Sequence, residues 1–369
     1  MRPFLSYIVR RVKKYFIWAG GLLLLIAVGI ANSGDFISHY GYVVKKTAAG
    51  DSGFSVSPLD IGAVSPEYFS LITEPTDGIT PVLSRIENAK SSIDLVMYAL
   101  DDTQVEQALG AAEARGVKVR VLLNGGYYDQ KEPANDASYV ALQKLNVPVE
   151  WTPTSFALTH QKTLVVDGND ALIMTFNLQI KYYATGRDFA VDDTDPNDVA
   201  AIEKTFDADW SAPQNEYIAG QGDDLVWSPG SEDETLYLIN SATSTLKIYN
   251  EEMDDTDVTN ALVAAAARGV QVQVDMTYAT DWKPAFTQLE TGGVDVRTFA
   301  SSSKIIYIHA KMILADDTRV FIGSENFSDS SLNKNRELGI VLTSPAIIEQ
   351  LDGVFSGDWA HARPFVIPK

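Results

Sequence analysis

The sequence predicts an α/β fold built twice, as two similar halves that each contain a β-sheet flanked by helices. Its 369 residues, 46% of them hydrophobic, are too many for one ordinary domain and enough for two sizeable cores. An internal repeat divides the chain, because Ala89 to Val121 aligns without gaps on Ala242 to Val274 at a constant offset of 153 residues. In each copy, strand-like and helix-like runs alternate, as in a sheet with helices on its faces.

The first element is a basic head followed by an apolar run. Asp35 is the first acidic residue, and the cations before it are Arg2, Arg10, Arg11, Lys13 and Lys14. Tyr15 to Ala31 carries no charge, which predicts a hydrophobic helix that targets the chain to a membrane. Its length favours an uncleaved anchor, and small residues near Ala31 leave signal cleavage open. By the positive-inside rule, the body is then exported: membrane-anchored, or secreted or periplasmic after cleavage.

Composition and the repeat together predict four regions. Residues 1–33 are the basic head and signal-anchor, and residues 34–66, rich in Ser, Gly and Ala, form a weakly structured linker. The first half covers 67–215 and the second half covers 216–369. The chain has no Cys, which excludes disulfides, thiolate nucleophiles and sulfur-ligated metals. A formal net charge of −20 disfavours a phosphate backbone, so nucleic acid ranks below other partners.

In each copy of the repeat, an amphipathic helix lies between two strands. The apolar spacing i, i+3, i+4, i+7 is shared by Val105, Ala108, Leu109 and Ala112 and by Val258, Ala261, Leu262 and Ala265. Thr103 and Thr256 are expected to cap these helices, and Gly116 and Gly269 to follow their ends. Strands are expected at 93–98, 117–123, 246–249 and 270–276. Strand, helix, strand predicts a parallel pair in each half.

A second repeated stretch, at an offset of 149 residues, carries polar residues suited to chemistry. His160, Lys162 and Asp167 match His309, Lys311 and Asp316 in the same spacing. The register continues from Thr175, Asn177, Arg187, Asp188 and Asp209 onto Ser324, Asn326, Arg336, Glu337 and Asp358. The chain has four histidines, and the remaining two, His39 and His361, have no counterpart.

This spacing predicts one shared cleft. Residues i and i+2 of a strand point to the same face, so each histidine lies beside its lysine, and the hairpins that follow bring Thr175 with Asn177, and Ser324 with Asn326, to the strand ends. A pseudo-twofold axis between the halves would bring all of these groups into one active site. They suit a phosphoryl group, because one imidazole can attack phosphorus, another can protonate the departing alkoxide, and lysines and amides stabilise the oxygens.

These motifs resemble those of the phospholipase D superfamily, His-x-Lys-x4-Asp followed by Gly-Ser/Thr-x-Asn. The resemblance spans roughly Leu71 to Trp359. It implies a phosphodiesterase that forms a covalent phosphohistidine and uses no metal or other cofactor. It assigns His160 as the nucleophile and His309 as the general acid, although the sequence alone does not order them.

The resemblance also implies roles for the carboxylates. Asp188 and Glu337, each 28 residues after a histidine, match the carboxylates that orient the imidazoles, whereas Asp167 and Asp316 have a structural role beside the turn. The first copy departs from the pattern, because Met174 stands where the second has Gly323. The shape of the first half's phosphate contact is therefore open.

Three functions remain open at this point. The first is a membrane-associated phosphodiesterase that hydrolyses a phospholipid or transfers its phosphatidyl group to an alcohol, and the alternative is an exported endonuclease of the same superfamily. The third is a phosphate-binding or interaction module without activity. Two motifs in one chain remove the need for a dimer to complete the site. Aromatic residues before the motifs either line an acyl or alcohol site or pack in the core; they are Tyr127, Tyr128, Trp151, Phe156, Tyr278, Trp282 and Phe299.

Overall fold

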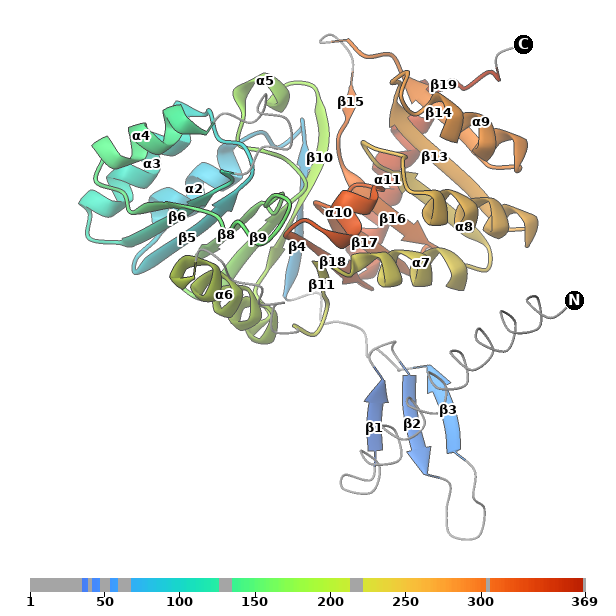
Figure 1. Cartoon of the computed structure of the whole chain (residues 1–369), viewed down its shortest axis with the longest axis horizontal. Coiled ribbons are helices and arrows are strands. Elements are labelled where there is room, and N and C mark those ends of the chain that lie inside the picture. The colour runs from blue at the N-terminus through green and yellow to red at the C-terminus, as the bar shows by residue number, and fades with distance from the viewer. Residues whose placement is uncertain are drawn as a thin grey trace, which may run out of the picture. The chain divides into compact units, whose positions relative to one another are not determined.

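The computed structural model describes residues 68–125, 135–212, 222–302 and 306–367, together with the backbone of three strands nearer the N-terminus. The chain divides into two compact units, residues 1–63 and 64–369 (Figure 1). The hydrophobic helix expected within residues 1–33 lies outside the described residues. Among the helices that the structure does describe, none has the length and apolar character needed to span a bilayer.

The smaller unit contains a three-stranded antiparallel sheet. Its strands are β1 (Asp35–Ser38), β2 (Tyr42–Lys46) and β3 (Phe54–Pro58), in the order β1-β2-β3. The expectation of a weakly structured linker over 34–66 is therefore wrong for these segments. Val43, Val44 and Val56 are β-branched residues within them, and such side chains favour extended backbone even in a stretch otherwise rich in Ser, Gly and Ala.

The first half of the larger unit is a mixed sheet with helices on both faces (Figure 1). The sheet order is β15-β10-β9-β8-β5-β6-β7, and β4 pairs with β10. The strands are β4 (Phe69–Glu74), β5 (Ser92–Met97), β6 (Lys118–Leu123), β7 (Val149–Trp151), β8 (Thr163–Val166), β9 (Asp170–Met174) and β10 (Gly186–Asp193), joined by β15 (Tyr307–Ile308) from the second half. The helices are α2 (Thr80–Asn88), α3 (Thr103–Ala114), α4 (Asp136–Lys144), α5 (Ile180–Tyr183) and α6 (Pro196–Ser211).

The second half repeats this arrangement. Its sheet has the order β11-β18-β17-β16-β12-β13-β14-β19. The strands are β11 (Leu225–Ser228), β12 (Thr245–Tyr249), β13 (Gln271–Thr277), β14 (Asp295–Phe299), β16 (Lys311–Ala315), β17 (Arg319–Gly323), β18 (Glu337–Leu342) and β19 (Arg363–Pro364). The helices are α7 (Ser231–Ser241), α8 (Thr256–Ala267), α9 (Lys283–Thr291), α10 (Asp329–Asn333) and α11 (Pro345–His361). The prediction of two similar α/β halves is confirmed.

Strand pairing follows the predicted connections. β5 pairs in parallel with β6 across α3, and β12 pairs in parallel with β13 across α8. The hairpins that follow the two histidine motifs, β8 with β9 and β16 with β17, are antiparallel. Each motif therefore sits at the entrance of a hairpin in the middle of its sheet, where neighbouring strands fix its position.

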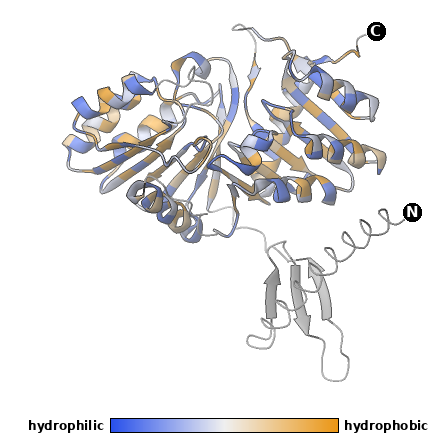
Figure 2. Cartoon of the chain, viewed as in Figure 1, coloured by the Kyte–Doolittle hydropathy of each residue, from blue (hydrophilic) through white to orange (hydrophobic). Residues whose placement is uncertain are grey.

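The hydrophobic core has two outer layers and one shared layer. One outer cluster packs α2, α3 and α4 on the first sheet, and another packs α7, α8 and α9 on the second. The cluster between the sheets combines residues of both halves, such as Ile173 and Phe189 with Met312 and Ile340. Hydrophobic residues concentrate on the strands, while the outer helices carry hydrophilic residues as well (Figure 2). Since burial of apolar area stabilises both halves through this common layer, they form one compact unit.

The predicted helix caps are one residue off. Asp102 and Asp255, rather than Thr103 and Thr256, have extended backbone and accept hydrogen bonds from the first-turn N–H groups of α3 and α8. Both residue types cap well, and the aspartate comes first along the chain, so the threonine becomes the first helical residue. The predicted glycines are confirmed: Gly116 and Gly269 follow the helices with φ of +90° and +94°, where a side chain would be strained.

Asp167 and Asp316 hold the hairpins to the preceding strands. Each has φ of +55° and accepts hydrogen bonds from three successive backbone N–H groups, those of residues 90–92 and 243–245 respectively. Partial burial opposes ionisation of Asp167, but these hydrogen bonds lower its pKa to about 2. The pKa of Asp316 is lowered in the same way.

We expect Asp167→Asn to destabilise the protein by about 1–2 kcal/mol at neutral pH, since charged hydrogen bonds are lost. The folded-state pKa lies below the ordinary value of 3.8, so the carboxylate contributes its stabilisation above pH ~4 and loses it as the pH falls to about 2. Urea unfolding at several pH values measures both effects, with the exposed Asp281→Asn as control. A variant as sensitive to acid as the wild type would contradict this account.

Candidate active site

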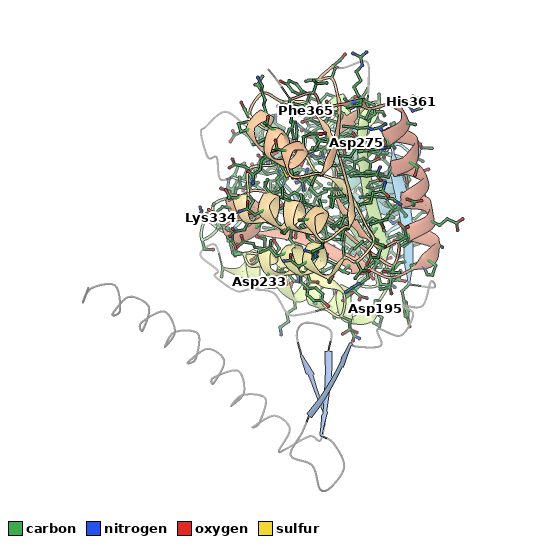
Figure 3. All side chains as sticks on the ribbon, turned by 90° about the vertical axis from the view of Figure 1, so that its right-hand side faces the viewer. Asp195, Asp233, Asp275, Lys334, His361 and Phe365 are labelled. Carbon is green, nitrogen blue, oxygen red and sulfur yellow. The ribbon has the colours of Figure 1, made fainter. Side chains whose placement is uncertain are left out.

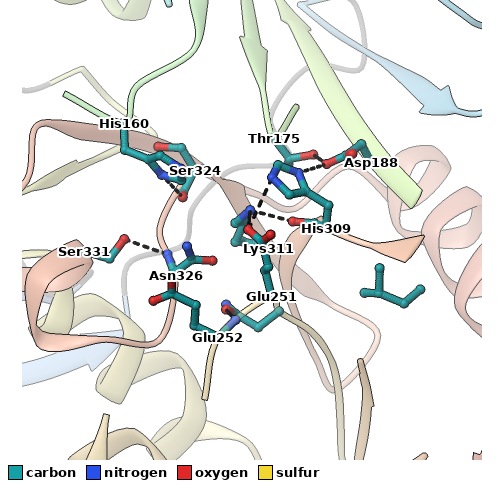
Figure 4. Close-up of polar contacts among 12 residues, drawn as sticks. His160, Thr175, Asp188, Glu251, Glu252, His309, Lys311, Ser324, Asn326 and Ser331 are labelled. Carbon is teal, nitrogen blue, oxygen red and sulfur yellow. Dashed lines mark hydrogen bonds and ion pairs between the residues drawn. The ribbon is translucent and has the colours of Figure 1, made fainter. Parts of the chain in front are cut away.

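A pocket of about 370 Å³ lies where the two halves meet. His160 and Asn177 line it from the first half, and His309 and Asn326 line it from the second. The structure thus brings together the residues that the repeat predicts would share a cleft (Figure 4). The other two histidines are not part of it: His39 lies outside the described residues, and His361 lies at the end of α11 on the periphery, bonded to the carbonyl of Gly357 (Figure 3).

Each histidine segment is fastened to the opposite half through its backbone. The N–H groups of His160 and Gln161 donate to the carbonyl of Arg336, at 2.9 and 3.1 Å. Those of His309 and Ala310 donate to the carbonyl of Arg187, at 3.2 and 2.9 Å. The histidines therefore precede β8 and β16 instead of lying within a strand, which differs from the expected placement. These backbone hydrogen bonds between the halves fix the position of each histidine, as hydrogen bonds to a neighbouring strand would in a longer strand.

Each lysine is buried beside its own histidine. Lys162 donates from Nζ to the carbonyl of His160, and Lys311 donates to the carbonyl of His309 at 2.6 Å. Both ammonium groups are thus held on the same side as the imidazoles, as predicted. Burial and the neighbouring charge of Lys311 lower the pKa of Lys162 to about 7.

The carboxylates cross between the halves. Glu337 accepts from Nδ1 of His160 at 2.8 Å, and Asp188 accepts from Nδ1 of His309 at 2.8 Å. Each imidazole is therefore oriented by the carboxylate of the other repeat, and not by the one that follows it by 28 residues. Glu337 is further bound by Ser331 and by Asn335, and Asp188 accepts from the hydroxyl of Thr175 at 2.6 Å.

His160 is held as a neutral imidazole. Burial lowers its pKa to about 4, which outweighs the opposing attraction of Glu337. The single proton of the neutral ring lies on Nδ1, because that nitrogen faces the carboxylate and the carbonyl of Ser324. Nε2 is then left with its lone pair. This is the protonation state that a nucleophile requires.

The predicted hydroxyl and amide residues divide by position. Asn177 and Asn326 line the pocket, where their amides can meet substrate oxygens. Thr175 and Ser324 lie behind it and are fully buried, and their hydroxyls accept from the backbone N–H groups of Phe189 and Leu338 at 2.9 and 3.2 Å. The hydroxyls therefore join each motif to the neighbouring strand instead of reaching into the pocket.

Met174 leaves these neighbours in place. In the second half, a Cβ at Gly323 would lie 2.3 Å from a carboxyl oxygen of Glu325, so the glycine makes room for that buried side chain. In the first half, the positions of Gly323 and Glu325 are taken by Met174 and Phe176, which both pack in the apolar core. The first half therefore has no buried carboxyl at this position that a glycine would have to accommodate. Burial and the charge of Glu337 raise the pKa of Glu325, which is therefore held as a neutral acid.

Two arginines, one from each half, form ion pairs with aspartates of the opposite half. Arg336 forms a bidentate pair with Asp209, at 3.1 and 2.9 Å, and is fully buried. Arg187 forms the equivalent pair with Asp358, at 2.6 and 3.0 Å. Both pairs cross between the halves, in the same sense as the histidine–carboxylate pairs.

Sequence reasoning missed the residues that cover the two histidines. The ring of Tyr98 lies edge-on to His160, with centroids 4.5 Å apart. Glu251 approaches His309, and the hydroxyl of Tyr307 donates to Glu251 at 2.7 Å. The repeat carried no signal for them, because these positions differ between the copies.

The aromatic residues named from the sequence have mixed positions. Tyr278 and Trp282 line the pocket. Trp151 stacks on Tyr139 and Phe299 is buried in the shared core, while Phe156 packs against the guanidinium of Arg336. Tyr127 and Tyr128 lie outside the described residues. Core packing therefore accounts for Trp151 and Phe299, a cation–π contact for Phe156, and pocket lining for Tyr278 and Trp282.

Comparison with known proteins supports this arrangement. A family model described as "Cardiolipin synthase, PLD-like domain" matches residues 82–210 and 236–359, one match in each half. The chain is 25% identical to a phospholipase D of Rickettsia conorii over 169 residues, which is 46% of this chain and 81% of that protein. It is also 25% identical to cardiolipin synthase A of Pseudomonas entomophila over 331 residues, 76% of this chain and 66% of that enzyme.

Among solved structures, the phosphatidylserine synthase of Haemophilus influenzae has a similar fold. It superposes with a TM-score of 0.65 at 12% sequence identity, over 82% of this chain and 88% of that one. At this identity the similarity concerns the fold alone. It shows that the paired α/β halves are an arrangement found in another protein.

Proposed function

The chain belongs to the phospholipase D-like family, since the family model covers more than half of it, and on that premise we propose that it cleaves or transfers a phospholipid phosphodiester through a covalent phosphohistidine. The observation that carries the proposal is the pair of imidazoles, His160 and His309, that face one pocket from opposite halves. Each is oriented through Nδ1 by a buried carboxylate, so each presents Nε2 to the pocket.

The first chemical step uses the two imidazoles in different protonation states. The lone pair of Nε2 of neutral His160 attacks phosphorus, and the bond from phosphorus to the leaving alcohol oxygen breaks. That oxygen takes the proton from Nε2 of His309 and departs as the free alcohol. Asn177 and Asn326, with Lys162 and Lys311 behind them, stabilise the charge on the remaining phosphoryl oxygens.

The second step reverses the roles of the groups. Water or an acceptor alcohol attacks phosphorus and gives its proton to His309, and the bond between phosphorus and His160 breaks. Water produces hydrolysis and an alcohol produces transfer, so the same site supports both outcomes. Both histidines return to their starting states, and the atoms balance without any further reagent.

Pocket composition favours a lipid over a nucleic acid. Among the described residues that line the pocket, none is Lys or Arg, whereas Glu251 and Glu252 are acidic and Tyr278 and Trp282 are aromatic. A polynucleotide needs cations along its track, and the formal net charge of −20 opposes its approach. A single diester with an apolar remainder fits this lining better.

The direct test incubates the full chain in mixed micelles with chelator, against phosphatidylcholine, phosphatidylglycerol and plasmid DNA in parallel. We expect release or exchange of a lipid head group, loss of turnover in His160→Ala, and no change in His361→Ala. Added ethanol should appear in a new phosphatidyl ester, because the intermediate accepts alcohols. DNA cleavage that His160→Ala abolishes, without lipid turnover, would replace this proposal by the endonuclease.

The predicted signal-anchor suits a lipid substrate. We propose that residues 1–33 hold the body at a membrane surface, where a phospholipid is at high local concentration. The proposal rests on the basic head and the apolar run alone.

A further inference from the structure

The two half-sites share their motif and differ in what covers it. In the repeat register, Glu251 occupies the position of Tyr98, and Tyr307 occupies the position of Leu158. On the first half, the ring of Tyr98 packs against His160 and lies 5.1 Å from Nζ of Lys162. On the second half, an oxygen of Glu251 lies 3.3 Å from Nε2 of His309 and 3.1 Å from Nζ of Lys311 (Figure 4).

This difference gives the imidazoles different electrostatic surroundings. His309 has a carboxylate at each ring nitrogen, Asp188 at Nδ1 and Glu251 at Nε2. A neutral imidazole carries no charge, so an ion pair with both carboxylates at once requires the imidazolium, which has an N–H at each ring nitrogen. His160 has a carboxylate at Nδ1 alone, because an aromatic ring covers its other side.

Glu251 is itself fixed in the ionised state. The hydroxyl of Tyr307 donates to one oxygen at 2.7 Å, and Lys311 donates to the other at 3.1 Å. Burial opposes its ionisation, but His309 and Lys311 hold its pKa well below the usual range. When the Glu251 carboxylate separates from Nε2 of His309, the proton therefore stays on the imidazole. The reason is that Tyr307 and Lys311 stabilise Glu251 as an anion.

We propose that Glu251 is a positioning residue that keeps a proton on Nε2 of His309 and points it into the pocket, so that the second half is the acid half of the site. This inference rests on the proposed function and deepens it. When the diester binds, its leaving oxygen replaces Glu251 as the acceptor of the His309 proton. Before substrate binds, Glu251 takes the place of that oxygen, and its negative charge opposes binding of the anionic diester.

The other groups that face His309 come from several elements. They are Asp188 on β10, Lys311 on β16, Tyr307 on β15, Tyr182 stacked on the ring from α5, and Glu251 after β12. Only Asp188 and Glu251 of this set are carboxylates in contact with the ring. Removing Glu251 therefore leaves one anion on His309, which reproduces the surroundings of His160.

The test compares Glu251→Gln with the wild-type full chain. Gln keeps the shape and can still accept from Tyr307, but it carries no charge. The chain has four histidines, so NMR titration of the imidazole protons follows each one separately. We expect the His309 titration to move down by about one pH unit or more, and His160 and His361 to stay in place. Glu349→Gln on the surface of α11 makes the same change in net charge and should move none of them.

Kinetics give a second readout that misfolding does not imitate. For an unactivated diester, kcat of Glu251→Gln should fall about tenfold or more on the alkaline side, with the alkaline limb of the pH profile moved to lower pH. KM should fall as well, because the anion that competes with substrate is gone. General damage to the site would raise KM. Tyr307→Phe removes a hydrogen bond to Glu251 and leaves the charge of Glu251 in place, so it should shift the His309 titration less than Glu251→Gln does. This variant provides the comparison if Glu251→Gln folds poorly.

Each result decides one of the two proposals. A His309 titration that is unchanged in Glu251→Gln overturns the role of Glu251. Absence of turnover by the wild type on lipid and on simple diesters overturns the proposed function, and the titration then still decides whether Glu251 holds the proton. For Glu251→Gln, an alkaline limb of the kcat profile moved to lower pH, together with a lower KM, supports both the role of Glu251 and the proposed function.

Discussion

Replacing His160 with alanine is expected to abolish turnover of every phosphodiester, whereas His309→Ala is expected to spare the first step, formation of the phosphohistidine, for those whose leaving group departs without a proton. The reason is the division of roles in the site. His160 forms the bond to phosphorus, so no substrate bypasses it. His309 supplies a proton to the leaving oxygen, and a nitrophenolate leaves without one.

The measurement compares an alkyl diester with its nitrophenyl analogue. For His309→Ala, we expect a loss of about 10²–10⁴ in kcat on the alkyl diester. On the nitrophenyl diester we expect a rapid burst of nitrophenolate followed by slow turnover, because the second step lacks its base. For His160→Ala, both rates should fall below detection. His361→Ala, on the periphery, is the control for loss of a histidine as such. If His160→Ala were the variant that released the nitrophenolate burst, the two roles would be reversed.

Arg336→Ala is expected to produce the largest loss of stability, about 3–5 kcal/mol in the free energy of unfolding. Its guanidinium is fully buried, and removal leaves the buried carboxylate of Asp209 without that bidentate partner. Arg187→Ala is expected to cost less. Its pair with Asp358 is about a tenth exposed, and Asp358 keeps a hydrogen bond from the hydroxyl of Tyr249 at 2.7 Å.

Urea unfolding of the two single variants measures the difference. Because loss of the bidentate counter-charge of a buried carboxylate is the main cost, the double variant Arg336→Met with Asp209→Leu should recover much of what Arg336→Ala loses. Equal losses for Arg336→Ala and Arg187→Ala would show that burial of the pair is not the deciding quantity. A double variant less stable than Arg336→Ala would show that loss of the counter-charge is not the main cost of the Arg336→Ala substitution.

The repeat made most of the fold and the centre of the site predictable. Helices α3 and α8, their flanking strands and the hairpins after each histidine follow from local patterns of apolar residues and turns, which act within a few residues. The meeting of His160 with His309 follows from the pseudo-symmetry, because equal sequences fold alike and pack about an axis. The threonine caps failed for a local reason, since an equally good cap stood one residue earlier.

The rest depends on contacts between distant segments. The pairing of His160 with Glu337 crosses 177 residues, and a spacing of 28 residues along the chain gives no indication of it. Glu251 could not be predicted from the repeat, because a repeat indicates the positions that the copies share and this position is where they differ. Met174 is explained only together with Phe176, because the first copy has an apolar side chain where the second has Glu325, the residue for which Gly323 makes room.

The crossed pairing has a consequence for how the two copies evolve. A histidine of one copy works with a carboxylate of the other, so a substitution at position 160 or 337 alone breaks a pair that both copies supply, and the same holds for positions 309 and 188. Mutational drift in one copy is therefore restrained by the other, and a gene that lost either copy would leave the remaining histidine without its carboxylate. Positions 98 and 251 contact the histidine and lysine of their own copy, and these are positions at which the two copies differ.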